Sequence, residues 1–284
     1  YIMKKGFLII SLFVISLSII AQGPYAPSAG EIGSTAIHRD SSAFGTWATA
    51  CTITRGLQDI SNASIGNTNV GTNTSAIGKS GLNGVVSLGD GGSATLTFPS
   101  PIINGLGADF AVFENGFKNI NLGGFFLELA FVEVSSDGVN FFRFDAISLT
   151  DNSIQTSGFG TTHATNLYNL AGKYKSSYGT PFDLDELAGI SGLNINNITH
   201  IKVIDVVGNI NPIYASYDSQ NSIINDPWPT PFGSSGFDLD AIGVINSTTT
   251  KIAELNNNNS INIFPNPFKN ILTIQLEQQQ NYEY

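Results

Sequence analysis

The chain has 284 residues, of which only 12% are charged, and its 22 acidic and 12 basic residues give a formal net charge of −10. An acidic chain lacks the basic face that neutralises phosphates, so we expect no nucleic-acid partner. The single cysteine, Cys51, excludes an internal disulfide framework and any metal site built from several cysteines. General disorder is excluded as well, because 42% of the residues are hydrophobic and 19 are Phe.

The first 21 residues are typical of a secretory signal peptide. Lys4 and Lys5 form a positive start, residues 6–20 are apolar or small, and Ala21 provides a small-residue cleavage point. The apolar run is shorter than the roughly 20 residues that span a bilayer, so we expect no transmembrane anchor. The sequence therefore predicts removal of residues 1–21 and a mature protein that is secreted or held at the outer cell surface.

Residues 22–246 form the predicted body of the protein. Only residues 183–188 are predicted to form a helix, a short one. Many strands with few helices predict an all-β fold, a β-sandwich of jelly-roll-like type. The predicted strands are apolar or β-branched runs between Gly-rich turns, at residues 94–98, 110–113, 125–135, 141–144, 200–207 and 237–245.

Two segments of the body resemble parts of the galactose-binding-like, discoidin-type jelly rolls. Residues 132–142 resemble a hairpin of that family, and their Asp-Gly pair predicts a two-residue turn. Residues 237–245 resemble the closing strand of such modules. Together with residues 109–115 and 226–232, they are similar to an uncharacterised group of secreted Bacteroidetes cell surface proteins. The resemblance implies a fold and a location, and it implies no reaction.

Acidic residues within or near predicted strands are the candidates for a metal site. Asp238 and Asp240 are two positions apart on a strand, so their side chains share one face. A preceding loop adds Asp218, Asn221 and Asp226. Because Ca²⁺ takes six to eight oxygen ligands of these types, the five residues are a candidate site for structural Ca²⁺. The alternative is that the carboxylates accept hydrogen bonds from loops.

The strand acids also raise the alternative of an enzyme. A polysaccharide hydrolase needs two carboxyls that face one cleft, and further acids lie in predicted strands at Glu114, Glu128, Glu133 and Asp205. No nucleophile elbow or metal-binding His motif accompanies them. Most acids on the strands of a sandwich organise loops, so we expect a protein that is not an enzyme, with the hydrolase as the runner-up.

Aromatic residues in loops are the candidate ligand contacts. Rigid aromatic faces in loops stack on sugars and on other flat ligands. Trp228 lies among three prolines that stiffen its loop, and the alternative for this residue is that it closes the end of the core. The other candidates are Tyr214, Tyr217, Tyr174 and Tyr178.

The C-terminal part begins with a polar linker at residues 247–260, rich in Asn and Thr. Residues 261–276 then place a Pro-Asn-Pro turn between two short apolar runs, which predicts a strand, a tight turn and a second strand. The segment resembles the start of the C-terminal sorting domain of the Bacteroidetes type IX secretion system. The residues that match the motif of that family are Phe264, Pro265, Asn266 and Pro267.

This resemblance implies export through the type IX secretion machinery, which recognises the sorting domain. The sequence ends at Tyr284, so we expect residues 261–284 to be an incomplete sorting domain. Taken together, the patterns predict a secreted, non-catalytic cell-surface protein that binds a glycan or another extracellular nutrient. The alternatives are an extracellular polysaccharide hydrolase and a structural adhesion or matrix protein. A cleft with two carboxylates favours the hydrolase, and a loop-rimmed aromatic face favours the binder.

Overall fold

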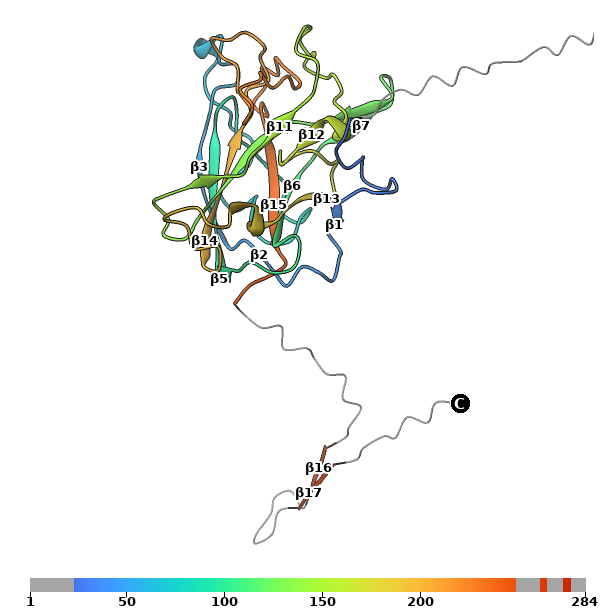
Figure 1. Cartoon of the computed structure of the whole chain (residues 1–284), viewed down its shortest axis with the longest axis vertical. Helices are drawn as coiled ribbons and strands as arrows, with labels where there is room; N and C mark the ends of the chain where they lie inside the picture. Colours follow the sequence, from blue (N-terminus) through green and yellow to red (C-terminus); the bar gives the residue numbers. More distant parts are fainter. Residues whose placement is uncertain (1–22, 249–260, 265–272, 277–284) are drawn as a thin grey trace, which may run out of the picture.

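The computed structural model describes residues 23–248, 261–264 and 273–276 (Figure 1). Regular structure in these residues is β apart from three single-turn 3-10 helices, η1 (Ala63–Ile65), η2 (Ala164–Asn166) and η3 (Leu184–Leu187). Two antiparallel sheets form the body, and the predicted all-β fold is therefore confirmed.

The first sheet has the order β1–β13–β6–β15–β2, and β4 pairs with β15 outside this order. Two of its interior strands, β6 and β15, are buried along their whole length. The strands of this sheet are β1 (Ile37–His38), β13 (Tyr178–Phe182), β6 (Phe110–Glu114), β15 (Asp238–Val244), β2 (Thr46–Trp47) and β4 (Val86–Ser87).

The second sheet has the order β10–β9–β14–β5–β3. Its strands are β10 (Phe142–Arg143), β9 (Ala130–Ser135), β14 (Ile198–Asp205), β5 (Ser93–Ile102) and β3 (Ala50–Thr54). Three strand pairs lie outside the two sheets. They are β7 (Phe117–Asn119) with β8 (Gly124–Phe126), β11 (Ile147–Ser148) with β12 (Leu167–Tyr168), and β16 (Ile261–Phe264) with β17 (Thr273–Leu276).

The two sheets pack face to face as a β-sandwich, with one layer around β6 and β15 and the other around β5 and β14 (Figure 1). Alternate residues of each strand point into the shared core, as the two-residue period of a strand requires. Cys51 belongs to this core, and burial raises the pKa of its thiol to about 11. Core residues that face each other from the two layers include Phe110, Val112, Leu239, Ile242, Leu96, Val132, Ile201 and Val203.

The outer faces of both sheets are also covered. Phe113 and Ala241 point away from the main core of the first sheet and pack under the rings of Phe44 and Trp47. A separate cluster around Leu129, Phe131 and Leu167 covers the other face of β9. A carboxylate on β15 therefore has little access to water, and it needs partners from the protein or from a ligand.

Most predicted strands match observed strands. Residues 94–98, 110–113, 200–207 and 237–245 fall largely on β5, β6, β14 and β15. The predicted strand 125–135 is wrong in its first half, where β8 ends at Phe126 and β9 begins at Ala130. In the gap, Leu127 and Leu129 pack into the cluster on the outer face, and the backbone N–H of Leu129 donates to Asp226. This segment therefore pairs with a loop carboxylate instead of a neighbouring strand.

The hairpin predicted around Asp137 is present, but its turn is longer than two residues. β9 and β10 pair in antiparallel register, with Phe142 opposite Val134, and residues 136–141 connect them. The carboxylate of Asp137 accepts hydrogen bonds from the backbone N–H groups of Val139 and Asn140, both over 2.8 Å, which supports the wider loop. The predicted helix at 183–188 is the 3-10 turn η3, and the Asp183 side chain caps its start.

Several predictions fall on residues outside those described. They are the signal peptide at 1–21, most of the linker, and Pro265, Asn266 and Pro267 of the sorting motif. β16 and β17 pair in antiparallel register, with Phe264 opposite Thr273, as predicted for the two strands that flank this motif. Within the described ranges, no helix is long and apolar enough to cross a bilayer.

Candidate functional site

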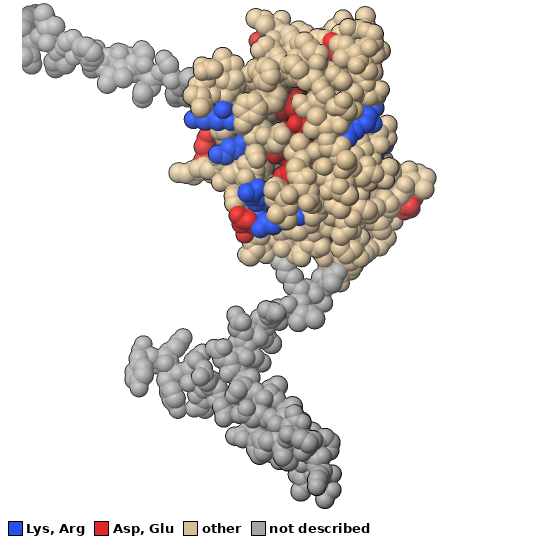
Figure 2. All heavy atoms as spheres, turned by 180° about the vertical axis from the view of Figure 1, so that it is seen from behind, with Lys and Arg blue, Asp and Glu red and all other residues tan. Residues whose placement is uncertain are grey.

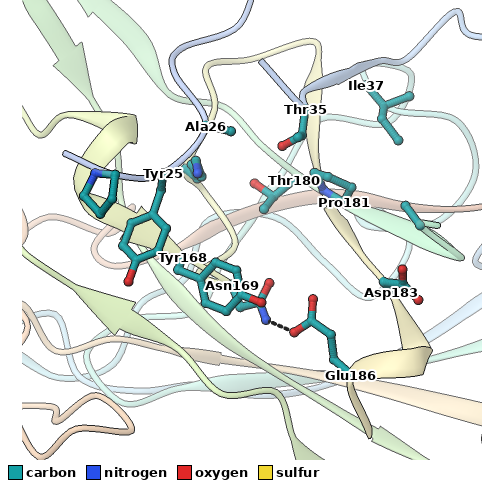
Figure 3. Close-up of a pocket in the computed structure, with 13 residues that line it drawn as sticks. Tyr25, Ala26, Thr35, Ile37, Tyr168, Asn169, Thr180, Pro181, Asp183 and Glu186 are labelled. Atoms are coloured by element: carbon teal, nitrogen blue, oxygen red, sulfur yellow. Dashed lines mark hydrogen bonds between the residues drawn. The ribbon is translucent and has the colours of Figure 1, made fainter. Parts of the chain in front are cut away.

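A pocket of about 450 Å³ opens beside β1 and β13 (Figure 3). We call it the tyrosine pocket. Four parts of the chain meet there, namely the N-terminal segment, the edge of the first sheet, the end of β12 and the turn η3. Its lining consists of Pro24, Tyr25, Ala26, Thr35, Ile37, Ala108, Tyr168, Asn169, Lys173, Thr180, Pro181, Asp183 and Glu186.

Two tyrosine rings form one wall of this pocket. Tyr25 and Tyr168 are stacked, with ring centroids 5.3 Å apart and planes inclined by 30°. The backbone N–H of Tyr25 donates to the carbonyl of Thr165 over 3.1 Å, which holds the N-terminal segment against the body. Both rings are half-buried, so each keeps part of its surface open to the pocket. The stacked pair gives the pocket an aromatic wall (Figure 3).

Polar groups line the rest of the pocket. The hydroxyl of Thr180 is buried and has no hydrogen-bond partner among the residues that the structure describes. Asn169 has a left-handed backbone, with φ of 47°, and its side-chain amide donates to the carboxylate of Glu186. Because most buried hydroxyls are paired, the unpartnered Thr180 hydroxyl stands out among the polar groups of the lining. The strained backbone of Asn169 is a feature that clusters at binding sites.

Burial changes the titration of several groups here. It lowers the pKa of Lys173 to about 8, and the Lys173 ammonium donates to the carbonyl of Leu167 over 2.7 Å. Burial also raises the pKa of the Glu186 carboxyl, although the hydrogen bond from Asn169 opposes that rise. The pKa of Tyr168 is raised, first by burial and then by the neighbouring Glu186. The pocket thus combines an aromatic wall with hydroxyl, amide, ammonium and carboxyl groups.

A second, smaller pocket of about 180 Å³ lies where the β7–β8 hairpin meets the segment before β15. We call it the acidic pocket, because Glu128 and Asp238 both line it. Figure 2 shows a surface on which charged side chains are sparse, with acidic atoms in a hollow near its middle. The remaining lining residues are Asn115, Phe117, Phe126, Phe159, Thr230, Phe232 and Ser234.

None of the five aromatic residues chosen from the sequence lines the tyrosine pocket. Trp228 is half-buried, and its indole N–H donates to the carboxylate of Asp90 over 3.1 Å. Tyr217 is 39% exposed, while Tyr214 and Tyr178 are half-buried. The expectation of an exposed ring is wrong for Tyr174, which is 1% exposed.

The ring of Tyr174 lies in the interior of the protein. Its hydroxyl bonds to that of Thr35 over 2.8 Å, and Thr35 lines the tyrosine pocket. The side chain of Tyr174 therefore supports this pocket from behind, and its ring is not available for stacking on a ligand.

Four of the five residues chosen for calcium accept hydrogen bonds from different parts of the chain. Asp218 accepts from the backbone N–H groups of residues 148, 220 and 222, and Asp226 accepts from that of Leu129. Asp238 accepts from the hydroxyl of Ser87 and the amide of Asn115. Asp240 accepts from the hydroxyl of Ser80, while Asn221 is exposed. Within the described parts of the chain, no three His, Cys, Asp or Glu residues are arranged to hold a metal ion.

Sequence reasoning missed the main residues of the tyrosine pocket. Tyr25 follows the predicted signal peptide closely, and Tyr168 lies in a two-residue strand without a periodic pattern. Only the packing of the N-terminal segment on β12 brings the two rings together. Glu128 was noted as a strand acid, but its place in a pocket with Asp238 depends on the gap between β8 and β9.

Comparison with protein-family models, curated proteins and solved structures found no match to this chain. The geometry of the two pockets and the patterns in the sequence are therefore the basis for a functional assignment.

Proposed function

We propose that the chain is a secreted, non-catalytic cell-surface protein whose tyrosine pocket binds a glycan or another hydroxyl-rich nutrient. One observation carries this proposal, namely the stacked wall of Tyr25 and Tyr168 beside the unpartnered hydroxyl of Thr180. The volume of about 450 Å³ lies within the range of small-molecule sites.

A sugar suits this combination of groups. The C–H face of a sugar ring packs on a flat aromatic surface, while its hydroxyls donate and accept hydrogen bonds. Thr180 offers a free hydroxyl, and Asn169, Asp183 and Glu186 offer further polar atoms from the same lining. A purely apolar ligand would leave the buried Thr180 hydroxyl without a partner, which costs free energy.

The export route rests on the two ends of the sequence. The apolar leader at residues 1–21 favours secretion, and the motif from Phe264 to Pro267 favours the type IX secretion machinery as a partner. The antiparallel pairing of β16 with β17 is compatible with the opening of a sorting domain. For the body, the resemblance to discoidin-type modules favours a jelly-roll-like sandwich.

A polysaccharide hydrolase is the second candidate, because Glu128 and Asp238 line one pocket. Two carboxyls at one cavity are the minimum that glycoside hydrolysis requires. The acidic pocket holds only about 180 Å³ and is walled by Phe rings, which leaves little room for a polysaccharide chain. Release of reducing ends from polysaccharides by the purified protein would favour the hydrolase over the binder.

A structural calcium ion is a further part of the sequence-based hypothesis. The hydrogen bonds made by Asp218, Asp226, Asp238 and Asp240 favour the alternative role of anchoring loops. Thermal melting with and without EGTA distinguishes a structural calcium ion from loop anchoring. A lower Tm in EGTA supports calcium, and an unchanged Tm supports loop anchoring alone.

A glycan array probed with the full chain tests the proposed binding. We expect a defined set of glycans to bind, and Tyr168→Ala to weaken that binding by about tenfold or more through loss of the stacked wall. Tyr217→Ala is the matched control, because it removes an exposed ring that does not line the pocket.

Two results would contradict this proposal. One is the absence of any bound glycan, which would favour the structural adhesion or matrix protein. The other is loss of binding in Tyr217→Ala with full binding in Tyr168→Ala, which would move the site to the loop chosen from the sequence. Melting curves of both variants show whether each remains folded.

A further inference from the structure

The acidic pocket adjoins a group of buried carboxyls that lack a matching positive charge. Burial raises the pKa of Glu114, Glu128, Asp205 and Asp226 well above the ordinary range, and it raises that of Asp238 to about 6. The neighbouring negative charges raise the pKa of Glu128 further. None of the ion pairs among the described residues includes these five groups. Arg55 lowers the pKa of Asp238 and partly opposes the effect of burial.

Glu128 differs from the other carboxyls in its partners. Asp205 accepts hydrogen bonds from two backbone N–H groups, Asp226 from one, and Asp238 from two side chains. Glu114 accepts one from Gly116. Glu128 is only 5% exposed and lines the pocket, yet its carboxyl accepts no hydrogen bond from any residue in the described ranges. Since unpaired buried carboxyls are costly, Glu128 is the carboxyl of this group that gains most from a partner.

Phe rings form the walls around this carboxyl. Phe117 stacks on Phe126 at 4.9 Å, Phe126 lies 5.9 Å from Phe159, and Phe159 lies 6.0 Å from Phe232, measured between ring centroids. Phe117, Phe159 and Phe232 are between 46% and 57% exposed. Three large rings gathered in contact with solvent at one pocket mark an interaction site.

The combination of ring faces and a free carboxyl selects one type of ligand. A metal ion needs a sphere of oxygen ligands, and no three His, Cys, Asp or Glu residues in the described ranges are arranged to hold one. A cation beside Glu128 stabilises the charged form of its carboxyl, whereas a neutral ligand does not. An organic cation gains both from a carboxylate and from the negative faces of aromatic rings. We propose that the acidic pocket binds an alkylammonium group, with Glu128 as its carboxylate partner and the Phe rings as its walls.

This ligand chemistry has two sources. One is a free amine or quaternary ammonium compound in the medium, and the other is a lysine side chain of a partner protein. The proposal concerns a different pocket from the glycan site, so Tyr168→Ala is expected to bind ammonium probes as the unmodified protein does. Failure of one proposal is thereby distinguishable from failure of the other.

Calorimetric titration of the full chain in an amine-free phosphate buffer tests the proposal. The probes are n-butylammonium and tetramethylammonium chloride, with 1-butanol as the neutral control. We expect binding of at least one ammonium probe that is about tenfold or more tighter than that of butanol. Nα-acetyl-lysine amide separates the sources, because a lysine-binding pocket takes it at least as tightly as n-butylammonium, whereas a pocket for free amines binds it more weakly.

Two variants define the role of the carboxylate. Glu128→Gln keeps the shape of the side chain and removes the charge, and we expect it to weaken ammonium binding by about tenfold or more. Glu133→Gln is the matched control, since Glu133 pairs with Arg143 over 2.8 Å and does not line the pocket. Phe159→Ala removes an exposed ring and is expected to weaken binding several-fold.

The proposal is overturned by equal binding of butanol and the ammonium probes, or by no binding of either probe. Full ammonium binding in folded Glu128→Gln overturns it as well, as does full binding in folded Phe159→Ala. The melting curve of each variant confirms that the protein tested is folded.

Discussion

The indole of Trp228 donates a hydrogen bond from Nε1 to Oδ2 of Asp90 over 3.1 Å. The same oxygen accepts a second bond from the backbone N–H of Ile60 over 2.8 Å. Burial raises the pKa of Asp90, and both hydrogen bonds oppose that rise because they stabilise the charged form. The ring therefore ties its proline-rich loop to the residues around Asp90, and a structural role suits it better than the ligand contact expected from the sequence.

Trp228→Phe tests this role, because it keeps an aromatic ring and removes the donor. We expect the free energy of unfolding to fall by about 1–2 kcal/mol, as for loss of a hydrogen bond to a charged group. Urea titration measures it, and glycan binding should be unchanged. Tyr217→Phe is the control and should stay within about 0.5 kcal/mol of the unmodified protein. Unchanged stability with lost glycan binding would restore Trp228 as a ligand contact.

Between elements, buried carboxylates join loops to strands. Asp109 precedes β6 and is fully buried, and it accepts hydrogen bonds from the backbone N–H groups of Gly105 and Leu184 and from the amide of Asn246, each over 2.8 Å. It thus connects the β5–β6 loop, the turn η3 and the end of β15. Removal of such a hub leaves several buried donors unsatisfied.

Asp109→Ala should lower the free energy of unfolding by about 3 kcal/mol, because three donors lose one acceptor. Chemical denaturation measures the change. Asp151→Ala is the comparison, since the side chain of Asp151 is exposed and accepts hydrogen bonds from Ser153, and its effect should be within about 1 kcal/mol. Equal effects of the two substitutions would show that Asp109 does not hold these elements together.

The long strands could be predicted from the sequence, because their apolar residues alternate or are β-branched over five residues or more. The two-residue strands β1, β2, β4, β11 and β12 carry no such period, so they could not, whereas β10 was predicted as the second strand of a hairpin. The tyrosine pocket depends on contacts that β1 and β12 position, which is why Tyr25 and Tyr168 were missed. The sequence also singled out the carboxylates, but whether they bind a metal, a loop or a ligand depends on side-chain contacts across the fold.

Over the whole molecule, the buried carboxyls give stability an unusual dependence on pH. A carboxyl with a raised folded pKa keeps its proton where the unfolded chain has lost it, at about pH 4 and above. Stability is therefore full below the unfolded pKa and falls as the pH rises through the folded pKa. Asp238, with a folded pKa of about 6, accounts for about 3 kcal/mol between about pH 4 and pH 6.

We expect the Tm to fall as the pH is raised from about 4 to about 8, because Glu114, Glu128, Asp205 and Asp226 add to the effect of Asp238. Scanning calorimetry at a series of pH values measures this fall. The Tm of the Glu128→Gln variant should fall less over the same range. Exposed carboxyls with a lowered pKa, such as Asp137, change the stability only at pH values below this range. Lys173, with a pKa of about 8, changes the stability at pH values above this range. A Tm that rises with pH would contradict the prediction.

The most direct test of the central claim, that the tyrosine pocket is the ligand site, is hydrogen–deuterium exchange with and without a saturating glycan from the array. The claim predicts slower exchange at residues 24–37 and 164–186, where the backbone of the pocket lies. Slower exchange confined to residues 214–232, or no change with the glycan bound, would contradict it.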